Sequence, residues 1–244
     1  MTRLFVDLPL APGASLALPP GPARHVQVLR LQPGAALTLF DGRGGEWSAR
    51  VASMGRSAVA VEVGTHAALE RELACRVTLA VGMPANERMD ALVEKATELG
   101  VARIQPLVCE RSVLRLCGER AARKAAHWQG VAVAACEQSG RTRVPVVAQV
   151  LGLREWLAQP HGGADGARCV LSLREGARAF EAASFGAAAV FLNGPEGGLS
   201  EAEEALAIGA GFVPVSLGAR TLRADTAPVA VMAAIALGTR GSQA

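Results

Sequence analysis

The sequence predicts an α/β protein in which a small β-rich module precedes a larger domain with a mostly parallel sheet. Between Leu37 and Val63, runs of β-forming residues (LTLF, EWSARV and AVAVEV) are separated by the turn compositions DGRGG and SMGRS, which is typical of short strands. After Cys75, apolar strand-like runs alternate with helical stretches, as in RVTLAVGM, NERMDALVEKATELG and ARIQPLV. This alternation indicates a sheet that is covered by helices.

The stretch NERMDALVEKATELG has a clear helical pattern. Its apolar residues form one stripe at helical spacing, namely Met89, Leu92, Val93, Ala96 and Leu99. Gly100 suits the position just past the end of this helix, where a left-handed backbone conformation is common. The pattern changes from short strands to alternating strands and helices, which places the domain boundary near residues 65–74. We therefore expect domains at residues 1–70 and 75–244.

Composition limits the class of protein. Of the 244 residues, 50% are hydrophobic and 19% are charged, which excludes a disordered chain. The N-terminal apolar run is broken by Asp7 and by prolines, so it lacks the core of a signal peptide. The nearest candidate for a membrane span, residues 227–238, is shorter than the roughly 18 residues that such a span needs. We therefore expect a soluble, cytoplasmic protein with no membrane partner.

Cysteine and histidine give no sign of a metal site. No Cys-x-x-Cys pair occurs among the five cysteines, which are Cys75, Cys109, Cys117, Cys136 and Cys169. We interpret them as small buried side chains in a reducing compartment. No metal-ligand spacing occurs among the four histidines, which are His25, His66, His127 and His161. The sequence predicts neither a disulfide framework nor a bound metal.

Two strand–loop–helix units near the C-terminus carry the most informative motifs. In FLNGPEGGLSEAEE, a Gly-rich bend leads into a helix whose Ser200 and Glu203 fit a capping box. The acids in the first turn of this helix would repel a phosphate, and the bend matches neither the dinucleotide-binding pattern nor the P-loop. In the second unit, FVPVSL leads into GARTLRAD, a loop that holds Arg220, Arg223 and Asp225, before the helical stretch TAPVAVMAAIALG.

These two units identify a family resemblance. GPEGGLSEAE together with VSLGARTLRADTA closely resembles the paired C-terminal motifs of the ribosomal RNA small-subunit methyltransferase E family, in the SPOUT class of S-adenosylmethionine enzymes. Three further stretches agree in order: RHVQVLRLQPG, VEKATELGVARIQPLVCERS and ACEQSGRTRVPVV. The resemblance implies a small PUA-like β-barrel domain that binds RNA, followed by a C-terminal SPOUT α/β domain with a deep trefoil knot, and a homodimer.

The resemblance also implies where the cofactor binds. In such proteins the Gly-rich bends surround S-adenosylmethionine with backbone groups, and neutral loops suit a sulfonium cation that carries no phosphate. Matching the motifs assigns cofactor contact to Leu171, Ser172, Gly194, Pro195, Glu196, Gly197, Gly198, Ser216, Leu217, Gly218, Arg220, Leu222 and Arg223.

The family reaction is methyl transfer to N3 of one uridine in 16S ribosomal RNA. Uracil N3–H is a weak acid, so transfer requires loss of that proton and stabilisation of the negative charge that spreads to O2 and O4. We hypothesise that Arg220 or Arg223 stabilises this anion and that Glu196 or Asp225 positions or accepts the proton. Both arginines suit equally well a role in holding the loop or an RNA phosphate.

Two residues depart from the family pattern. Members usually carry Glu where this chain has Asp225, and many carry Lys where this chain has Ala85. The shorter carboxylate has less reach, and the missing lysine removes one basic contact. Both changes bear on RNA affinity or a side-chain role more than on cofactor binding.

Basic residues suggest an RNA surface. Residues 110–143 hold seven basic and three acidic side chains, a local charge of +4 by subtraction, although a solvated helix face explains this charge equally well. Because the chain has no tyrosine and only three tryptophans, we expect arginine–phosphate contacts to dominate. The candidates are Arg3, Arg24, Arg30, Arg111, Arg115, Arg120, Arg123, Lys124 and Arg141.

Two other functions stay open at this point. A SPOUT enzyme of this kind can act on another RNA atom such as a ribose 2′-oxygen, because fold alone does not fix the target. A non-catalytic RNA-binding assembly factor is the second alternative. The sequence also leaves open whether free 16S ribosomal RNA or an assembled small ribosomal subunit is the substrate.

Overall fold

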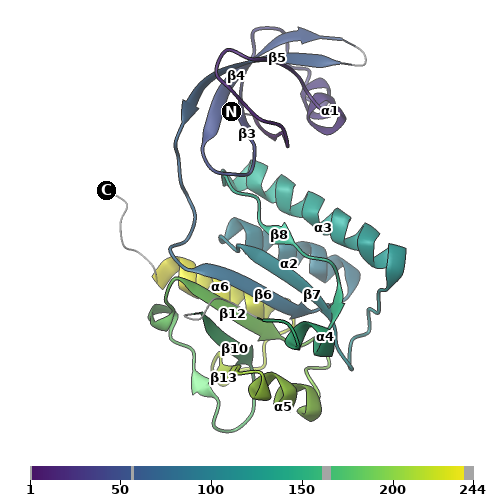
Figure 1. The fold of residues 1–244 in the computed structure, drawn as a ribbon, viewed down its shortest axis with the longest axis vertical. Helices are drawn as coiled ribbons and strands as arrows, with labels where there is room; N and C mark the ends of the chain where they lie inside the picture. The colour runs from purple at the N-terminus through teal and green to yellow at the C-terminus, as the bar shows by residue number, and fades with distance from the viewer. Residues whose placement is uncertain (1, 56–57, 161–165, 239–244) are drawn as a thin grey trace. The chain divides into compact units, whose positions relative to one another are not determined.

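The computed structural model describes residues 2–55, 58–160 and 166–238, which excludes His161 (Figure 1). By their internal contacts these residues divide into two compact units. The N-terminal unit comprises Met1–Glu72 together with Cys136–Val144, and the C-terminal unit comprises Leu73–Ala135 and Pro145–Ala244. The segment 136–144 thus belongs with the N-terminal unit, although it lies far along the chain.

The N-terminal unit is built on a five-stranded sheet with the order β1-β3-β4-β5-β2. Its strands are β1 (Arg3–Phe5), β2 (Ser15–Ala17), β3 (Ala36–Phe40), β4 (Glu46–Met54) and β5 (Val59–Ala67). β1 pairs with β3 in parallel, and the other pairs are antiparallel. Trp47, Ala49 and Val51 alternate with exposed residues along β4, so one face of the sheet forms the core of this unit. The strands predicted from LTLF, EWSARV and AVAVEV are confirmed.

Helix α1 (Pro20–Val28) lies in the predicted β-rich module, for which the sequence interpretation named no helix. Pro20 stands in the first turn, where its missing N–H costs little, but Pro-Gly-Pro also reads as a turn and so hides the start of the helix. Ala23 and Val26 bury one side of α1 in the core of the N-terminal unit. Two buried residues are too few to produce a helical stripe in the sequence.

The C-terminal unit is built on an eight-stranded sheet with the order β11-β13-β10-β12-β6-β7-β8, and β9 pairs with β7. Every strand pair of this sheet within the described residues is parallel, which confirms the predicted strand direction. The strands are β6 (Arg76–Gly82), β7 (Arg103–Val108), β8 (Val146–Val147), β9 (Leu151–Gly152), β10 (Ala167–Leu171), β11 (Arg178–Ala179), β12 (Ala188–Asn193) and β13 (Val213–Ser216).

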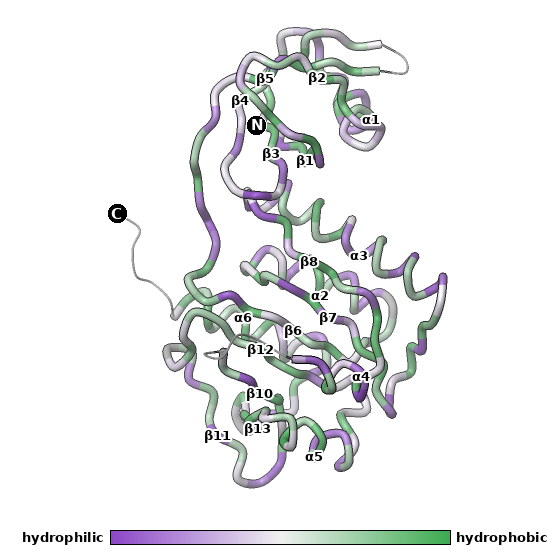
Figure 2. Tube along the Cα trace, viewed as in Figure 1, coloured by the Kyte–Doolittle hydropathy of each residue, from purple (hydrophilic) through white to green (hydrophobic). Residues whose placement is uncertain are grey.

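Helices cover both faces of this sheet. They are α2 (Asn86–Glu98), α3 (Gly118–Ser139), α4 (Leu153–Leu157), α5 (Glu201–Gly209), α6 (Thr226–Gly238) and the 3-10 helix η1 (Ala182–Ser184). Along β12, Phe191 joins the core formed with α2 and α6, whereas Val190 and Leu192 join the core formed with α4 and α5. Strands buried on both faces read as continuous apolar runs, which Figure 2 shows along β6 and β12.

Helix ends follow their local sequence signals. Gly100 has a φ of 93° just past α2, as predicted. At the start of α5, the Ser200 hydroxyl accepts a hydrogen bond from Glu203 N at 3.2 Å, and the Glu203 carboxylate accepts one from Ser200 N at 3.1 Å. The predicted capping box is therefore confirmed.

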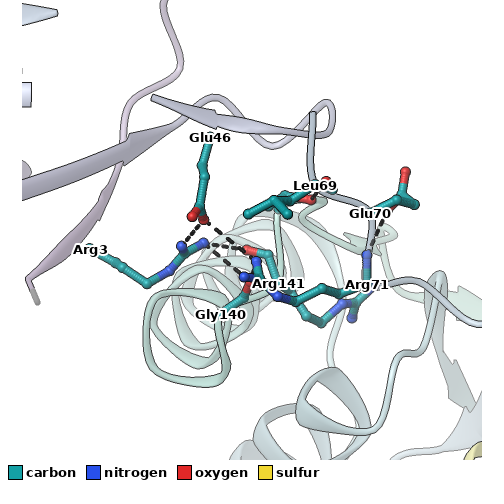
Figure 3. Close-up of polar contacts among 8 residues, drawn as sticks. Arg3, Glu46, Leu69, Glu70, Arg71, Gly140 and Arg141 are labelled. Carbon is teal, nitrogen blue, oxygen red and sulfur yellow. Dashed lines mark hydrogen bonds and ion pairs between the residues drawn. The ribbon is translucent and has the colours of Figure 1, made fainter. Parts of the chain in front are cut away.

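The segment 136–144 is held in the N-terminal unit by polar contacts (Figure 3). Arg3 pairs with Glu46 and donates to the carbonyl oxygens of Gly140 at 3.3 Å and Arg141 at 3.1 Å. Arg71 donates to the same Gly140 oxygen at 2.8 Å. The basic side chain of Arg3 therefore serves the fold of this unit.

Arg141 is the most buried charged residue of the segment. Its side chain is only 4% exposed, and its Nε donates to Glu72 Oε1 at 2.9 Å while Nη2 contacts Glu72 Oε2. Its neighbour Arg143 donates to Glu70 at 2.8 Å. The interpretation of Arg3 and Arg141 as surface contacts for RNA phosphates is not supported, because both guanidinium groups already bind carboxylates within the unit.

Removing one partner of the Glu72–Arg141 pair is expected to destabilise the protein. Glu72→Gln leaves the buried guanidinium of Arg141 without its counter-charge, so the free energy of unfolding should fall by about 3 kcal/mol. Urea unfolding measures this. The matched control is Glu62→Gln, since Glu62 is exposed and has no ion pair among the described residues, and equal midpoints for the two variants would contradict the prediction.

Four of the five cysteines are buried, as expected, but Cys117 is exposed, so the prediction was wrong there. All five are free thiols. Burial raises the pKa of the Cys109 thiol to about 12 and those of Cys136 and Cys169 to about 11. These three are thus inert thiols that pack as small apolar side chains.

Candidate active site

A cavity of about 680 Å³ lies in the C-terminal unit where three loops meet. The loops follow β10, β12 and β13, which are neighbours in the parallel sheet and end at Leu171, Asn193 and Ser216. Figure 1 shows these three strands side by side, with α5 packed beside them. The carboxyl ends of parallel strands are where ligands bind in open α/β sheets.

Most of the residues assigned to the cofactor by resemblance surround this cavity. Lining it are Leu171, Ser172, Gly194, Pro195, Glu196, Gly197, Gly198, Leu217, Arg220, Leu222 and Arg223. Ser216 and Gly218 do not line it, and the Ser216 hydroxyl instead accepts a hydrogen bond from Gly218 N at 3.3 Å. The geometry brings the motif residues together, and their contact with a cofactor stays a prediction.

Sequence reasoning missed a second set of lining residues. They are Arg88, Leu173, Arg174, Asn193, Leu199, Glu204, Val215, Thr221, Ala224 and Ala227. Several adjoin the motif residues, so a wider window around each motif would have found them. Arg88 lies on α2, more than a hundred residues before the Gly-rich bend, and only the fold brings it to the cavity.

The glycines of the 194–199 loop serve close packing. A Cβ on Gly194 would lie 2.7 Å from Leu199 N, and one on Gly197 would lie 2.9 Å from the Cβ of Arg111. Gly82, at the end of β6, would likewise place a Cβ 2.6 Å from Pro195 N. Of the three glycines in this loop, Gly198 combines a positive φ of 69° with open space. The expectation that these Gly-rich bends surround the cofactor with backbone groups therefore gives only part of the reason for the glycines.

The carboxylate of Glu196 is bound to the start of α2. Its Oε1 accepts a hydrogen bond from Ala85 N at 2.8 Å and lies 3.7 Å from Arg88 Nη1. Ala85 is the N-cap residue of α2 and has no capping side chain, and the Glu196 carboxylate binds its N–H at the positive end of the helix dipole. The Gly-rich loop is thereby tied to α2.

A second carboxylate in the cavity wall belongs to Glu204. Its Oε1 accepts a hydrogen bond from the Ser172 hydroxyl at 2.6 Å, and the same hydroxyl accepts one from Arg174 N at 3.1 Å. Asn193 forms another link, because its side-chain amide donates to Ala224 O at 2.8 Å. These bonds connect the loop after β10 to α5, and the end of β12 to the loop after β13.

Arg220 and Arg223 differ from Arg88, whose guanidinium lies 3.7 Å from the Glu196 carboxylate. Both are exposed and line the cavity, and neither guanidinium has a hydrogen bond or an ion pair within the part of the chain that the structure describes. They are available to bind an anionic group. Asp225 does not line the cavity, and its Oδ1 is buried without a hydrogen-bond partner among the described residues. The structure thus brings Glu196, and not Asp225, to the cavity with the arginines.

The remaining RNA candidates fall into two groups. Arg111 and Arg115 donate to backbone carbonyl oxygens, those of Gly197 and Leu199 for Arg111 and that of Glu110 for Arg115. The side chains that stay available at the surface are Arg24, Arg30, Arg120, Arg123 and Lys124, and Arg123 forms an i,i+4 pair with Glu119.

Two absences hold for the described residues. Residues 2–55, 58–160 and 166–238 hold no group of three His, Cys, Asp or Glu side chains that could hold a metal ion. In the same ranges, no helix has the length and apolar character needed to cross a membrane.

Family models match both parts of the chain. A model described as an RNA methyltransferase domain matches residues 71–236, and one described as an RNA methyltransferase PUA domain matches residues 23–64. The ribosomal RNA small subunit methyltransferase E of Synechocystis is 36% identical, with 86% of this chain and 68% of the relative aligned. That of Bacillus subtilis is 31% identical over 89% of each chain. The chain belongs to the ribosomal RNA small subunit methyltransferase E family.

Solved structures agree with this membership in the methyltransferase E family. The Neisseria gonorrhoeae enzyme of that name, solved with S-adenosylmethionine, has a TM-score of 0.87 at 37% identity, covering 96% of both chains. A Legionella pneumophila methyltransferase solved with the same cofactor has a TM-score of 0.90 at 30% identity, covering 97% of both chains. The predicted fold class, a SPOUT domain preceded by a PUA-like domain, is confirmed, and the trefoil knot stays a prediction.

Proposed function

We propose that this chain uses S-adenosylmethionine to methylate N3 of one uridine in the 16S ribosomal RNA of the small subunit. The observation that carries the proposal is the cavity at the ends of β10, β12 and β13, whose walls are formed by the motif residues of the family. Family membership and the cofactor-bound relative from Neisseria gonorrhoeae support the same activity.

The cavity fits this cofactor in size and in charge. Its volume of about 680 Å³ is in the range of small-molecule sites. The first turn of α5 carries Glu201, Glu203 and Glu204, which disfavours a phosphate and is compatible with a sulfonium cation. The apolar walls at Leu171, Leu217 and Leu222 suit an adenine ring, which has no charge to solvate.

The chemistry assigns distinct tasks to the charged side chains. S-adenosylmethionine supplies an electrophilic methyl group when it is bound. As N3 of uracil loses its proton, negative charge develops on O2 and O4, and a guanidinium from Arg220 or Arg223 stabilises that charge. Glu196 lines the same cavity and positions or accepts the proton, whereas Asp225 lies outside the lining.

RNA binding is proposed to use the basic side chains of α3, of which Arg120 and Arg123 are exposed and Lys124 is half-buried. Changing Arg120, Arg123 and Lys124 to Glu should weaken binding of 16S ribosomal RNA and lower the slope of log affinity against log salt by about 2, because each phosphate contact releases counterions. Cofactor affinity should stay the same. Filter binding at several salt concentrations measures the slope. An unchanged slope would show that these side chains are solvated and do not contact RNA phosphates.

We also propose that the protein acts as a cytoplasmic homodimer. The observation behind the dimer is α6, whose residues are nearly all apolar and whose Leu237 is 64% exposed. Sedimentation at micromolar concentration tests this, since a monomer there would contradict it.

The direct test of activity is methylation of small ribosomal subunits that lack the modification. The purified protein with S-adenosylmethionine should produce N3-methyluridine, which mass spectrometry of the digested RNA identifies. A methyl group on a ribose 2′-oxygen would indicate the alternative SPOUT reaction. No methylation and no cofactor binding at millimolar concentration would favour a non-catalytic assembly factor.

A further inference from the structure

The turn that follows β7 contacts the Gly-rich loop of the cavity. From this turn, Arg111 Nη1 donates hydrogen bonds to the carbonyl oxygens of Gly197 at 3.1 Å and Leu199 at 3.3 Å. Both acceptors belong to residues that line the cavity. One guanidinium therefore joins two points of the loop, 86 and 88 residues further along the chain.

The neighbouring residue of the same turn is fixed to the start of α5. Glu110 N donates to Glu203 Oε1 at 2.7 Å, and Glu203 is only 4% exposed. The other carboxylate oxygen of Glu203 completes the capping box of α5. Cys109 N donates to the Ser112 hydroxyl at 2.9 Å, which closes the turn. These hydrogen bonds hold the backbone of the turn in place, and with it the position from which the Arg111 side chain extends.

Arg111 and Gly197 are also closely packed against each other. A Cβ on Gly197 would lie 2.9 Å from the Cβ of Arg111 and 3.4 Å from its carbonyl oxygen. A contact under 3.0 Å forces one of the two segments to move, so only glycine fits beside this arginine. The φ of Gly197 is not positive, so space, and not backbone conformation, requires the glycine.

We propose that Arg111 is a positioning residue that holds the 194–199 loop in its cofactor-binding shape, and that it does not bind an RNA phosphate. This inference rests on the proposed function, because it assumes that the cavity takes S-adenosylmethionine. The loop has few side chains of its own to order it, so a guanidinium that binds two of its carbonyl oxygens limits the conformations open to it. A loop that is already ordered loses less conformational entropy when the cofactor binds, so the affinity for the cofactor is higher.

The test compares Arg111→Met, Arg111→Lys and the control Arg154→Met. Arg154 is an exposed arginine of α4 that does not line the cavity, and its guanidinium has no hydrogen bond or ion pair among the described residues. Calorimetry should show that Arg111→Met weakens S-adenosylmethionine binding by about tenfold to a hundredfold, the range for hydrogen bonds made by charged groups. Arg111→Lys should recover part of this loss, since its ammonium can still donate to a carbonyl oxygen, and Arg154→Met should bind S-adenosylmethionine like the wild type.

Kinetics separate positioning from a general loss of stability. With Arg111→Met, KM for the cofactor should rise while kcat at saturating cofactor and the urea midpoint change little. RNA affinity at saturating cofactor and its salt slope should also hold. If RNA affinity and salt slope fall while cofactor affinity stays at the wild-type value, Arg111 is an RNA contact and the inference is overturned.

A double-mutant cycle tests the contact itself. Gly197→Ala should weaken cofactor binding, because its new Cβ pushes against Arg111. Adding Arg111→Gly removes the atom that the new Cβ meets, so the two losses should be clearly less than additive. Additive losses would overturn the inference and leave the proposed function standing. A wild-type protein that fails to bind S-adenosylmethionine at millimolar concentration would overturn the proposed function itself and the inference that depends on it.

Discussion

Arg223→Lys is expected to lower the single-turnover rate of methyl transfer by about 10²–10³, the scale for losing one well-placed donor to a developing anion. Arg223 lines the cavity, and its guanidinium has no protein partner among residues 2–55, 58–160 and 166–238. Lysine keeps the positive charge but lacks the planar fork that can address a carbonyl oxygen and a neighbouring group together. Affinities for cofactor and RNA should therefore change little while the rate falls.

Rapid-quench measurement with saturating cofactor and RNA isolates this effect. Raising the pH should recover part of the loss, because a larger fraction of the uracil is then already deprotonated. Arg174→Lys is the matched control, since Arg174 is also exposed at the cavity but follows β10 instead of β13. If RNA affinity falls in Arg223→Lys and the rate at saturation holds, Arg223 is a phosphate anchor, and Arg220 or backbone N–H groups stabilise the anion.

Gly82→Ala is expected to damage the site through packing alone. The new Cβ would lie 2.6 Å from both Cδ and N of Pro195 and 2.9 Å from Gly194 C, so the end of β6 and the Gly-rich loop must separate. The free energy of unfolding should fall by about 3 kcal/mol, the upper part of the usual range for overpacking. Cofactor affinity should fall as well, because Gly194 and Pro195 line the cavity.

Gly130→Ala is the control for this change. Gly130 lies within α3, and a Cβ there meets nothing within 4 Å. Alanine should therefore raise the free energy of unfolding by about 0.5–1 kcal/mol, the usual gain in a helix interior. A Gly82→Ala variant that unfolds at the wild-type urea concentration and binds cofactor normally would show that β6 and the loop have room to separate.

Local signals explain what the sequence predicted well. The stripe of α2, the capping box of α5 and the runs of β6 and β12 each depend on residues within about a dozen positions of one another. The cofactor motifs belong to the same class, because their loops follow directly on strands of one parallel sheet. Helix α1 was missed, since Pro20 and its neighbours match a turn as well as a helix start.

Roles of charged side chains were the least predictable part of the site. In the sequence, Arg111, Arg123 and Arg141 look alike in one basic segment. In the fold, Arg111 donates to two carbonyl oxygens of a distant loop. Arg123 stays on an exposed helix face, and Arg141 is buried against Glu72. These partners lie up to 88 residues away, so no local pattern distinguishes the three. Arg88 entered the site in the same way, through Glu196.

The central claim is that this protein transfers a methyl group to N3 of a uridine in the small subunit. The most direct measurement is mass mapping of 16S ribosomal RNA after purified protein and S-adenosylmethionine react with small subunits from a strain that lacks its own methyltransferase E. We predict one N3-methyluridine per RNA with the wild-type protein and a single-turnover rate about 10²–10³ lower with Arg223→Lys. An RNA that carries its new methyl group on a ribose oxygen, or no new methyl group although the protein binds the cofactor, would contradict the account.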